Sequence, residues 1–100
     1  MQENIKKFFK NKNILITGGT GSFGRATTEY LLKTNPKKIV IFSRDELKQY
    51  HMQKDLNNKR LRYFIGDIRD RDRLNLAFRG IDIVIHAAAL KHVPKAEFDP

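Results

Sequence analysis

The 100-residue sequence contains no cysteine, no tryptophan and only three prolines. The absence of cysteine excludes a disulfide framework and a thiolate metal site, which suits a reducing compartment, so we expect a cytoplasmic protein that holds no metal. The longest mainly apolar run, Ile81 to Leu90, includes Asp82 and His86 and is far too short to span a bilayer. The first residues, MQENIKKFFKN, lack the apolar core of a secretory signal. We therefore expect no membrane partner.

Acidic residues are scarce beside basic ones, 11 against 20, so that the formal net charge is +9. One interpretation of this excess is a nucleic-acid surface. However, the basic clusters fall on different predicted elements, and no aromatic-rich stacking motif accompanies them. We favour a solvated surface that also attracts an anionic cofactor or substrate, and we expect no nucleic-acid partner.

Predicted strands and helices alternate along the chain. Apolar runs predict strands at residues 13–17, 38–43, 62–66 and 81–87. Helices are predicted from about Ser22, from a capping box at residues 43–46, and over a short segment that ends at Gly80. The first of these helices is expected to pack through Phe23, Ala26, Thr27, Tyr30 and Leu31. This β-α-β-α-β-α-β order predicts a parallel sheet with strand order 3-2-1-4, the first half of a Rossmann-like, doubly wound α/β fold.

Four glycines, Gly18, Gly19, Gly21 and Gly24, lie between the first strand and the first helix. In a strand-turn-helix unit of this kind, one glycine permits the tight turn, a second lets a pyrophosphate reach the backbone, and a third lets helix and strand pack closely. Two spacings fit, one starting at Gly18 and the other at Gly19, and both continue to Gly21 and Gly24. A merely flexible turn is the alternative. The context favours a dinucleotide-binding loop that includes Gly18, Gly21 and Gly24.

The residues after the second strand indicate which dinucleotide binds. Arg44 and Asp45 lie about 20 residues beyond Gly24, where an acid reads the ribose hydroxyl of NAD and an arginine accommodates the 2′-phosphate of NADP. Ser43 and Arg44 together offer a hydroxyl and a guanidinium to that phosphate. Asp45 has another interpretation, as an acid that stabilises the start of the following helix. We predict NADP in preference to NAD.

Two more candidate positions follow strands. Asp67 comes after the third strand and could accept a hydrogen bond from the adenine amino group, or could simply cap the next turn. At the end of the fourth strand, the small residues from Ala87 onward leave room for a cofactor, whereas His86 is interpreted as a packed side chain.

The motifs TGGTGSFG, SRDELKQ, FIGDIRD and HAAALKHVP, in this order, resemble the inverting UDP-N-acetylglucosamine 4,6-dehydratases of the extended short-chain dehydrogenase/reductase superfamily. These enzymes serve bacterial surface-polysaccharide and flagellin-glycan biosynthesis. By matching position, the resemblance implies contacts to the pyrophosphate from Thr20, Gly21, Ser22 and Phe23, to the ribose phosphate from Ser43, Arg44, Asp45, Glu46, Leu47 and Lys48, to adenine from Asp67 and Ile68, and to the nicotinamide side from Ala87. It also implies that Lys91 contacts cofactor and substrate, although a solvated lysine is the plainer interpretation.

The resemblance implies an NADP-dependent lyase acting on a UDP-linked amino sugar. The cofactor removes hydride from sugar C4, water leaves across C5–C6, and the hydride returns to C6 with C5 inverted. In the family, the catalytic Asp-Lys pair and Tyr-x-x-x-Lys motif belong further along the chain, so no catalytic residue is assigned here, and we expect those residues beyond Pro100. Two other functions stay open: a dinucleotide-binding module without chemistry, and an epimerase or reductase on the same fold.

The expected domain organisation follows from the position of the catalytic residues, which are expected beyond Pro100. Residues 1–100 are interpreted as the N-terminal part of a Rossmann domain, with the remainder and the substrate domain lying elsewhere in an intact, homo-oligomeric parent. The apolar fourth strand would form an edge of the sheet, so we expect the isolated chain to be marginally stable or to self-associate, and to be inactive.

Overall fold

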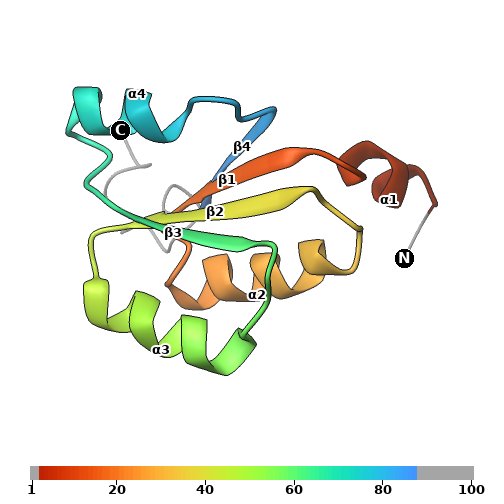
Figure 1. The fold of residues 1–100 in the computed structure, drawn as a ribbon, viewed down its shortest axis with the longest axis horizontal. Coiled ribbons are helices and arrows are strands. Elements are labelled where there is room, and N and C mark those ends of the chain that lie inside the picture. Colours follow the sequence, from red (N-terminus) through yellow and green to blue (C-terminus); the bar gives the residue numbers. More distant parts are fainter. Residues whose placement is uncertain (1–2, 88–100) are drawn as a thin grey trace, which may run out of the picture.

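Eight helices and strands follow one another in the part of the chain that the structure describes, residues 3–87 of this computed structural model. They are α1 (Glu3–Phe9), β1 (Asn13–Thr17), α2 (Ser22–Leu32), β2 (Lys38–Ser43), α3 (Glu46–Leu56), β3 (Leu61–Ile65), α4 (Arg71–Ala77) and β4 (Ile83–His86). The strands form one parallel sheet in the order β3-β2-β1-β4, with α2 and α3 on one face and α4 on the other (Figure 1). The predicted fold and strand order are confirmed.

All four strands run in the same direction, so all their amino ends lie along one side of the sheet and all their carboxyl ends along the opposite side. We call these two sides the amino edge and the carboxyl edge. Asn13 of β1 lies opposite Lys38 of β2, and Ile39 lies opposite Leu61 of β3. The amino ends of the strands lie toward α1, and the carboxyl ends lie toward the starts of α2, α3 and α4 (Figure 1). The loops that follow β1, β2 and β3 therefore meet at the carboxyl edge, where doubly wound sheets bind their ligands.

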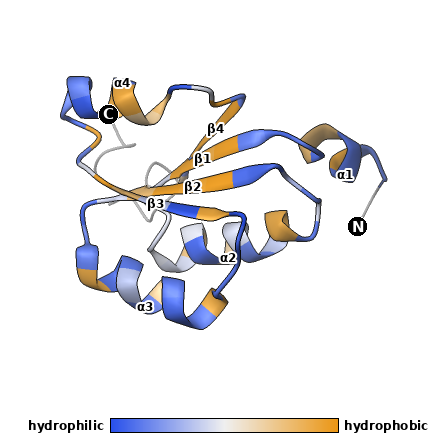
Figure 2. Cartoon of the chain, viewed as in Figure 1, coloured by the Kyte–Doolittle hydropathy of each residue, from blue (hydrophilic) through white to orange (hydrophobic). Residues whose placement is uncertain are grey.

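Alternating side chains of the inner strands give the sheet a hydrophobic core on each face. The core beside α2 and α3 contains Ile14, Ile16, Leu31, Ile39, Ile41, Met52, Leu61 and Ala87. On the other face, Leu15, Val40 and Phe42 pack with Ala77 of α4. Figure 2 shows hydrophobic residues concentrated along β1, β2 and β4. Burial on both faces explains why these strands read as continuous apolar runs rather than alternating ones.

Of the residues predicted to form the packing face of α2, only Leu31 is buried. Phe23 and Tyr30 are 49% and 42% exposed, whereas Gly24, Thr28 and Leu31 are buried. The hydroxyl of Thr28 donates to the carbonyl of Gly24 at 2.8 Å, so this polar side chain is satisfied against its own helix. Close approach of a helix to a sheet requires small residues, which a search for large apolar side chains does not find.

Some predicted element ends also differ. Ser43 is the last residue of β2 and does not cap α3; instead, the N-cap is Asp45, whose Oδ1 accepts from the N–H of Lys48 at 3.0 Å. Gly80 lies two residues beyond the C-cap of α4 with a φ of +71°. The third strand is Leu61–Ile65 and the fourth is Ile83–His86. Just before β4, the side chain of Asp82 accepts from the N–H of Asn13 at 2.8 Å.

Helix α1 precedes the first strand and was not predicted. Its apolar residues Ile5, Phe8 and Phe9 have helical spacing, and Phe9 packs against the core beside α2 and α3. Seven residues are too few for periodicity to separate a helix from a loop. None of the helices in residues 3–87 has the length and apolar character that a membrane crossing requires.

Candidate functional site

The loop between β1 and α2 forms one wall of a cleft at the carboxyl edge of the sheet. Gly18 has a φ of +65°, which favours glycine, and its N–H donates to the carbonyl of Phe42 at 2.8 Å. α2 then begins at Ser22, with Gly21 as an N-cap that makes no side-chain cap hydrogen bond. N–H groups in an uncapped first helical turn are well suited to bind phosphate oxygens.

Two of the glycines set how closely this loop packs. A Cβ added to Gly24 would clash with the carbonyl oxygen of Gly18 and lie 2.6 Å from the Cα of Gly19. A Cβ on Gly19 would lie 2.7 Å from Cγ2 of Ile41 in β2. Gly24 is buried and lies outside the cleft lining, so its role here is the close helix–loop contact rather than ligand contact.

The opposite wall comes from the end of β2 and the start of α3. Arg44 is exposed, and its Nη1 lies 3.6 Å from Oδ2 of Asp67. Asp45 uses one carboxylate oxygen to cap α3. Ser43 is buried, and its Oγ accepts from Nε2 of Gln49 at 3.0 Å. Because a hydroxyl that accepts one hydrogen bond still has its own proton, Ser43 can donate to an anion in the cleft.

A third wall follows β3. Asp67 accepts from the N–H of Arg69 at 2.9 Å through Oδ1, and from Nη2 of Arg69 at 2.7 Å through Oδ2. Hydrogen bonds from the Arg69 side chain, aided by its backbone N–H and by the Arg44 charge, hold the pKa of Asp67 well below its usual range. The same pairing raises the pKa of Arg69. Asp67 is therefore an ionised turn residue; the cap of α4 is Asp70, whose Oδ1 accepts from the N–H of Arg73 at 3.2 Å.

These three walls enclose a cleft of about 440 Å³. It is lined by Gly18, Thr20, Gly21, Phe42, Ser43, Arg44, Asp45, Lys48, Gly66, Asp67, Ile68 and Arg69. Glycine backbone, the exposed Arg44 and Lys48, and a paired acid surround it, which is a composition suited to a phosphate-containing ligand with an apolar portion. The geometry thus assembles residues from three separate loops into one anion-binding cleft.

The profile of the protein family described as "Polysaccharide biosynthesis protein" matches residues 14–100 of the sequence. The chain belongs to this family. It is 60% identical over 93 residues to UDP-N-acetylglucosamine 4,6-dehydratase (inverting) of Campylobacter jejuni, covering 92% of this chain and 28% of that enzyme. The resemblance noted in the sequence is confirmed.

Relatives with other names share the same region. The chain is 51% identical over 96 residues to UDP-glucose 4-epimerase of Rickettsia prowazekii, covering 92% of this chain and 28% of that enzyme. The X-ray structure of Pen from Bacillus thuringiensis superimposes with a TM-score of 0.80 at 46% identity, covering 93% of this chain and 29% of that one. The chain therefore spans under a third of the length of these relatives.

The fold brings together only part of the predicted site. In the cleft are Gly18, Thr20, Gly21, Ser43, Arg44, Asp45, Lys48, Asp67 and Ile68. Outside its lining are Ser22, Phe23, Gly24, Glu46, Leu47 and Ala87. Ala87 is buried in the core beside α2. The assigned contacts stay predictions.

Two of the sequence expectations fall on the last part of the chain. Lys91, the expected cofactor and substrate contact, lies outside the described residues, which end at residue 87. Pro100, beyond which the catalytic residues are expected, lies outside them too. The structure therefore tests neither the role of Lys91 nor the position of the catalytic residues, and both stay predictions.

His86 was interpreted as a packed side chain, and the structure places it differently. The residue is exposed in the described part of the chain, and its Nδ1 lies 3.0 Å from Oγ1 of Thr17 in β1. The contact follows from the register, which sets Thr17 opposite His86. A threonine on the neighbouring strand therefore holds the imidazole at the carboxyl edge of the sheet.

Sequence reasoning missed four residues that shape the cleft. Phe42, Gly66 and Arg69 line it, and Gln49 supports it from behind. Gly66 is needed because a Cβ there would lie 2.7 Å from the ring of Phe42. A glycine at the end of a predicted strand and next to Asp67 was the available signal for it. Arg69 gave no signal beyond its positive charge, and Gln49 gave none, since its hydrogen bonds run from α3 to Ser43 of β2 and Phe64 of β3.

Gln49 is buried and ties α3 to two strands. Its Nε2 donates to Oγ of Ser43 at 3.0 Å and to the carbonyl of Phe64 at 3.1 Å. We expect Gln49→Leu to lower the free energy of unfolding by about 1–3 kcal/mol, because the buried acceptors lose their donor while side-chain volume is retained. Urea unfolding measures this. Gln53→Leu, at an exposed position of the same helix, should change stability little; equal stability of both variants would contradict the assignment.

Proposed function

We propose that this chain forms the dinucleotide-binding part of an inverting UDP-N-acetylglucosamine 4,6-dehydratase, and that it binds NADP in preference to NAD. The observation that carries the proposal is the cleft itself, in which a glycine loop, an uncapped helix start and an exposed arginine face one another. The 60% identity to the Campylobacter jejuni enzyme supports the choice of reaction.

In this proposal each wall of the cleft has a separate task. The backbone N–H groups at the start of α2 hold the pyrophosphate, which can approach closely because Gly21 in the cleft lining has no side chain. Arg44, Lys48 and the hydroxyl of Ser43 hold the 2′-phosphate. Asp67 and Ile68 border the adenine. When bound, the cofactor supplies reversible hydride transfer, and this chain's residues orient it.

The choice of NADP over NAD rests on the contacts that Asp45 and Arg44 already make within the chain. Asp45 caps α3, so one of its carboxylate oxygens is already engaged with the N–H of Lys48. Arg44 has 70% of its side chain exposed and only one loose ion pair, to Asp67 at 3.6 Å, among the residues that the structure describes. An exposed guanidinium beside a committed carboxylate favours a ligand with an additional phosphate.

Exchange of this arginine tests the cofactor preference. We expect Arg44→Asp to move the ratio of NADP to NAD affinity by about tenfold or more toward NAD, since a charge-assisted hydrogen bond to phosphate contributes about 1.5–3 kcal/mol. Titration calorimetry with both nucleotides at one salt concentration measures the ratio. Arg71→Asp makes the same charge change outside the cleft lining and should leave the ratio unaltered. If both affinities are unaffected by Arg44→Asp, the 2′-phosphate binds elsewhere.

The reaction needs a separate test, because an epimerase shares this region at 51% identity. We propose to incubate the intact protein with UDP-N-acetylglucosamine and NADP and to follow the sugar by NMR. A 4-keto-6-deoxy sugar with inverted C5 supports the dehydratase. A C4 epimer that retains its oxygen at C6 supports the epimerase. Nucleotide binding with an unchanged sugar would favour a binding module without chemistry.

A further inference from the structure

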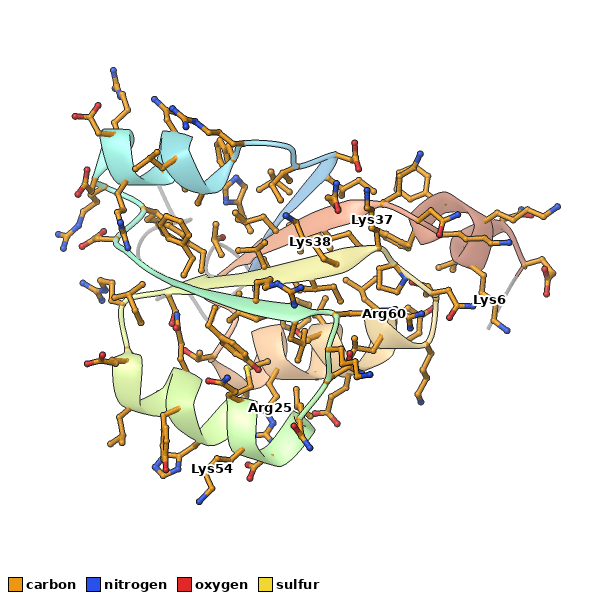
Figure 3. The ribbon with its side chains drawn as sticks, viewed as in Figure 1. Lys6, Arg25, Lys37, Lys38, Lys54 and Arg60 are labelled. Carbon is orange, nitrogen blue, oxygen red and sulfur yellow. The ribbon has the colours of Figure 1, made fainter. Side chains whose placement is uncertain are left out.

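A group of basic side chains occupies the amino edge of the sheet, opposite the cleft. This amino-edge basic face consists of Lys6, Lys7, Lys10, Lys12, Lys37, Lys38, Lys59 and Arg60. Backbone hydrogen bonds bring its segments together: the carbonyl of Lys12 accepts from the N–H of Lys37 at 2.9 Å, and that of Arg60 accepts from Ile39 at 2.8 Å. In Figure 3, Lys6, Lys37, Lys38 and Arg60 lie toward α1, whereas Lys54 lies on α3, away from them.

The charges of this face are not neutralised within residues 3–87. The ion pairs there involve Arg25, Arg44 and Arg69, and none involves a member of the basic face. Of the acidic residues beside it, Glu3 lies on α1, and Asp82 is bonded to the backbone of Asn13. Lysines clustered with so few acids produce a positive potential that attracts an extended anionic surface.

Two exposed apolar side chains adjoin these lysines on α1. Ile5 is 37% exposed and Phe8 is 59% exposed, on a helix that also carries Lys6 and Lys7. The next residue, Phe9, packs into the core and contacts Phe8 edge to face, with 5.0 Å between ring centroids. The helix is thus attached to the sheet by one aromatic ring while it presents another outward.

We propose that the amino-edge basic face docks on an anionic lipid surface, with Phe8 and Ile5 entering the headgroup region and the lysines contacting lipid phosphates. Basic clusters next to an exposed apolar helix face are the pattern of interfacial membrane binding. A nucleic acid fits less well, because proteins that bind single strands stack successive bases on several aromatic rings, whereas α1 exposes one such ring, Phe8, beside the aliphatic Ile5. This proposal departs from the sequence analysis, which expected no membrane partner and foresaw neither the helix α1 nor the meeting of these basic segments.

The geometry also gives this docking a direction. The basic residues lie on α1 and at the amino ends of the strands, and the residues that line the cleft lie at or after the carboxyl ends. Figure 1 shows these two ends of the strands on opposite sides of the sheet. A chain held by the basic face would therefore keep its cleft open to the aqueous side. The inference is independent of which nucleotide or sugar the cleft binds.

Vesicle co-sedimentation of the full chain tests the proposal. We expect binding to vesicles of equal parts phosphatidylglycerol and phosphatidylcholine, and at least about tenfold weaker binding to phosphatidylcholine alone or at about 0.5 M salt. Lys37→Glu with Lys38→Glu should weaken binding to the anionic vesicles by about tenfold or more. Phe8→Ser with Ile5→Ser should weaken it severalfold and leave the salt dependence in place.

Matched control variants distinguish the effect of losing the basic face from the effects of a lower net charge and of unfolding. Lys54→Glu with Arg71→Glu makes the same charge change on α3 and α4, and Tyr50→Ser removes an exposed aromatic ring of α3. These variants should bind vesicles nearly as the parent does, and circular dichroism should show every variant folded. Equal weakening by both charge pairs, absence of binding to anionic vesicles, or tight binding to a DNA or RNA oligonucleotide in place of vesicles would overturn the proposal.

Discussion

Replacing Gly24 by alanine should destabilise the fold more than any other single methyl addition at the glycine loop. The new Cβ would meet the carbonyl of Gly18 and the backbone of Gly19, where a Cβ–Cα distance of 2.6 Å is far below van der Waals contact. The neighbours are backbone atoms that no rotamer change can move. We therefore expect the free energy of unfolding to fall by about 3 kcal/mol or more, which is at or above the usual cost of an overpacked substitution. This loss should outweigh the better helix propensity of alanine.

Thermal and urea unfolding measure the effect of Gly24→Ala. A loss of about 3 kcal/mol corresponds to a fall in Tm of about 12–24 °C for a chain of this size. Gly80→Ala is the matched control: nothing lies within 4 Å of its added Cβ, but its φ is +71°. Strain without a clash should cost about 1–2 kcal/mol. If Gly24→Ala melts like the parent, α2 does not pack on the loop as closely as the structure places it.

Replacing Gly21 by valine should abolish dinucleotide binding and leave the fold intact. Gly21 has φ −71° and ψ 170°, an extended conformation that valine adopts readily. Its position as the N-cap of α2 in the cleft wall puts the added methyl groups where a pyrophosphate would approach the backbone. We expect the affinity for NADP to fall by about 100-fold or more, which equals about 2.7 kcal/mol.

Calorimetry with NADP, together with a melting curve, measures the effect of Gly21→Val. Thr20→Val serves as its control, because it exchanges a hydroxyl for a methyl group at the adjacent cleft residue without adding bulk. That variant should keep most of its affinity. Unchanged NADP affinity in a folded Gly21→Val protein would show that the loop does not hold the pyrophosphate, and the proposed function would lose its main support.

These two variants separate roles that the glycine motif combines. The sequence pattern treats Gly21 and Gly24 as members of one cofactor-binding signature. In the structure, Gly21 lines the cleft and Gly24 is buried behind it. A packing glycine and a ligand-facing glycine look alike in a sequence, since both simply lack a side chain; only their neighbours distinguish them.

The candidate site was predictable where a residue's role depends on its distance along the chain. Arg44 comes one residue after β2 and Asp67 two residues after β3, and parallel strands bring such positions to one edge, where these two side chains lie 3.6 Å apart. The roles of Gln49 and Arg69 were not predictable, because they depend on side-chain reach: Gln49 bonds to the adjacent strand, and Arg69 folds back on Asp67. Likewise, Asp45 rather than Ser43 caps α3, because β2 continues through Ser43 as the partner of β3.

The hydrophobic periodicity and the positions of the glycines determine the architecture of this protein and were sufficient to predict it. Runs such as residues 38–43, buried at nearly every position, require cover on both faces, and their alternation with helices leads to a parallel sheet of order 3-2-1-4. What depended on tertiary structure was the orientation of each surface. Phe23 and Tyr30 face outward, whereas Gly24 is buried against the backbone of the loop that follows β1. Basic residues that are scattered along the chain become one basic face because the amino ends of three strands and α1 meet at one edge. The local sequence pattern determines whether a segment forms a helix or a strand. Which of its side chains are buried, and which surfaces come together, depends on the elements that pack beside it.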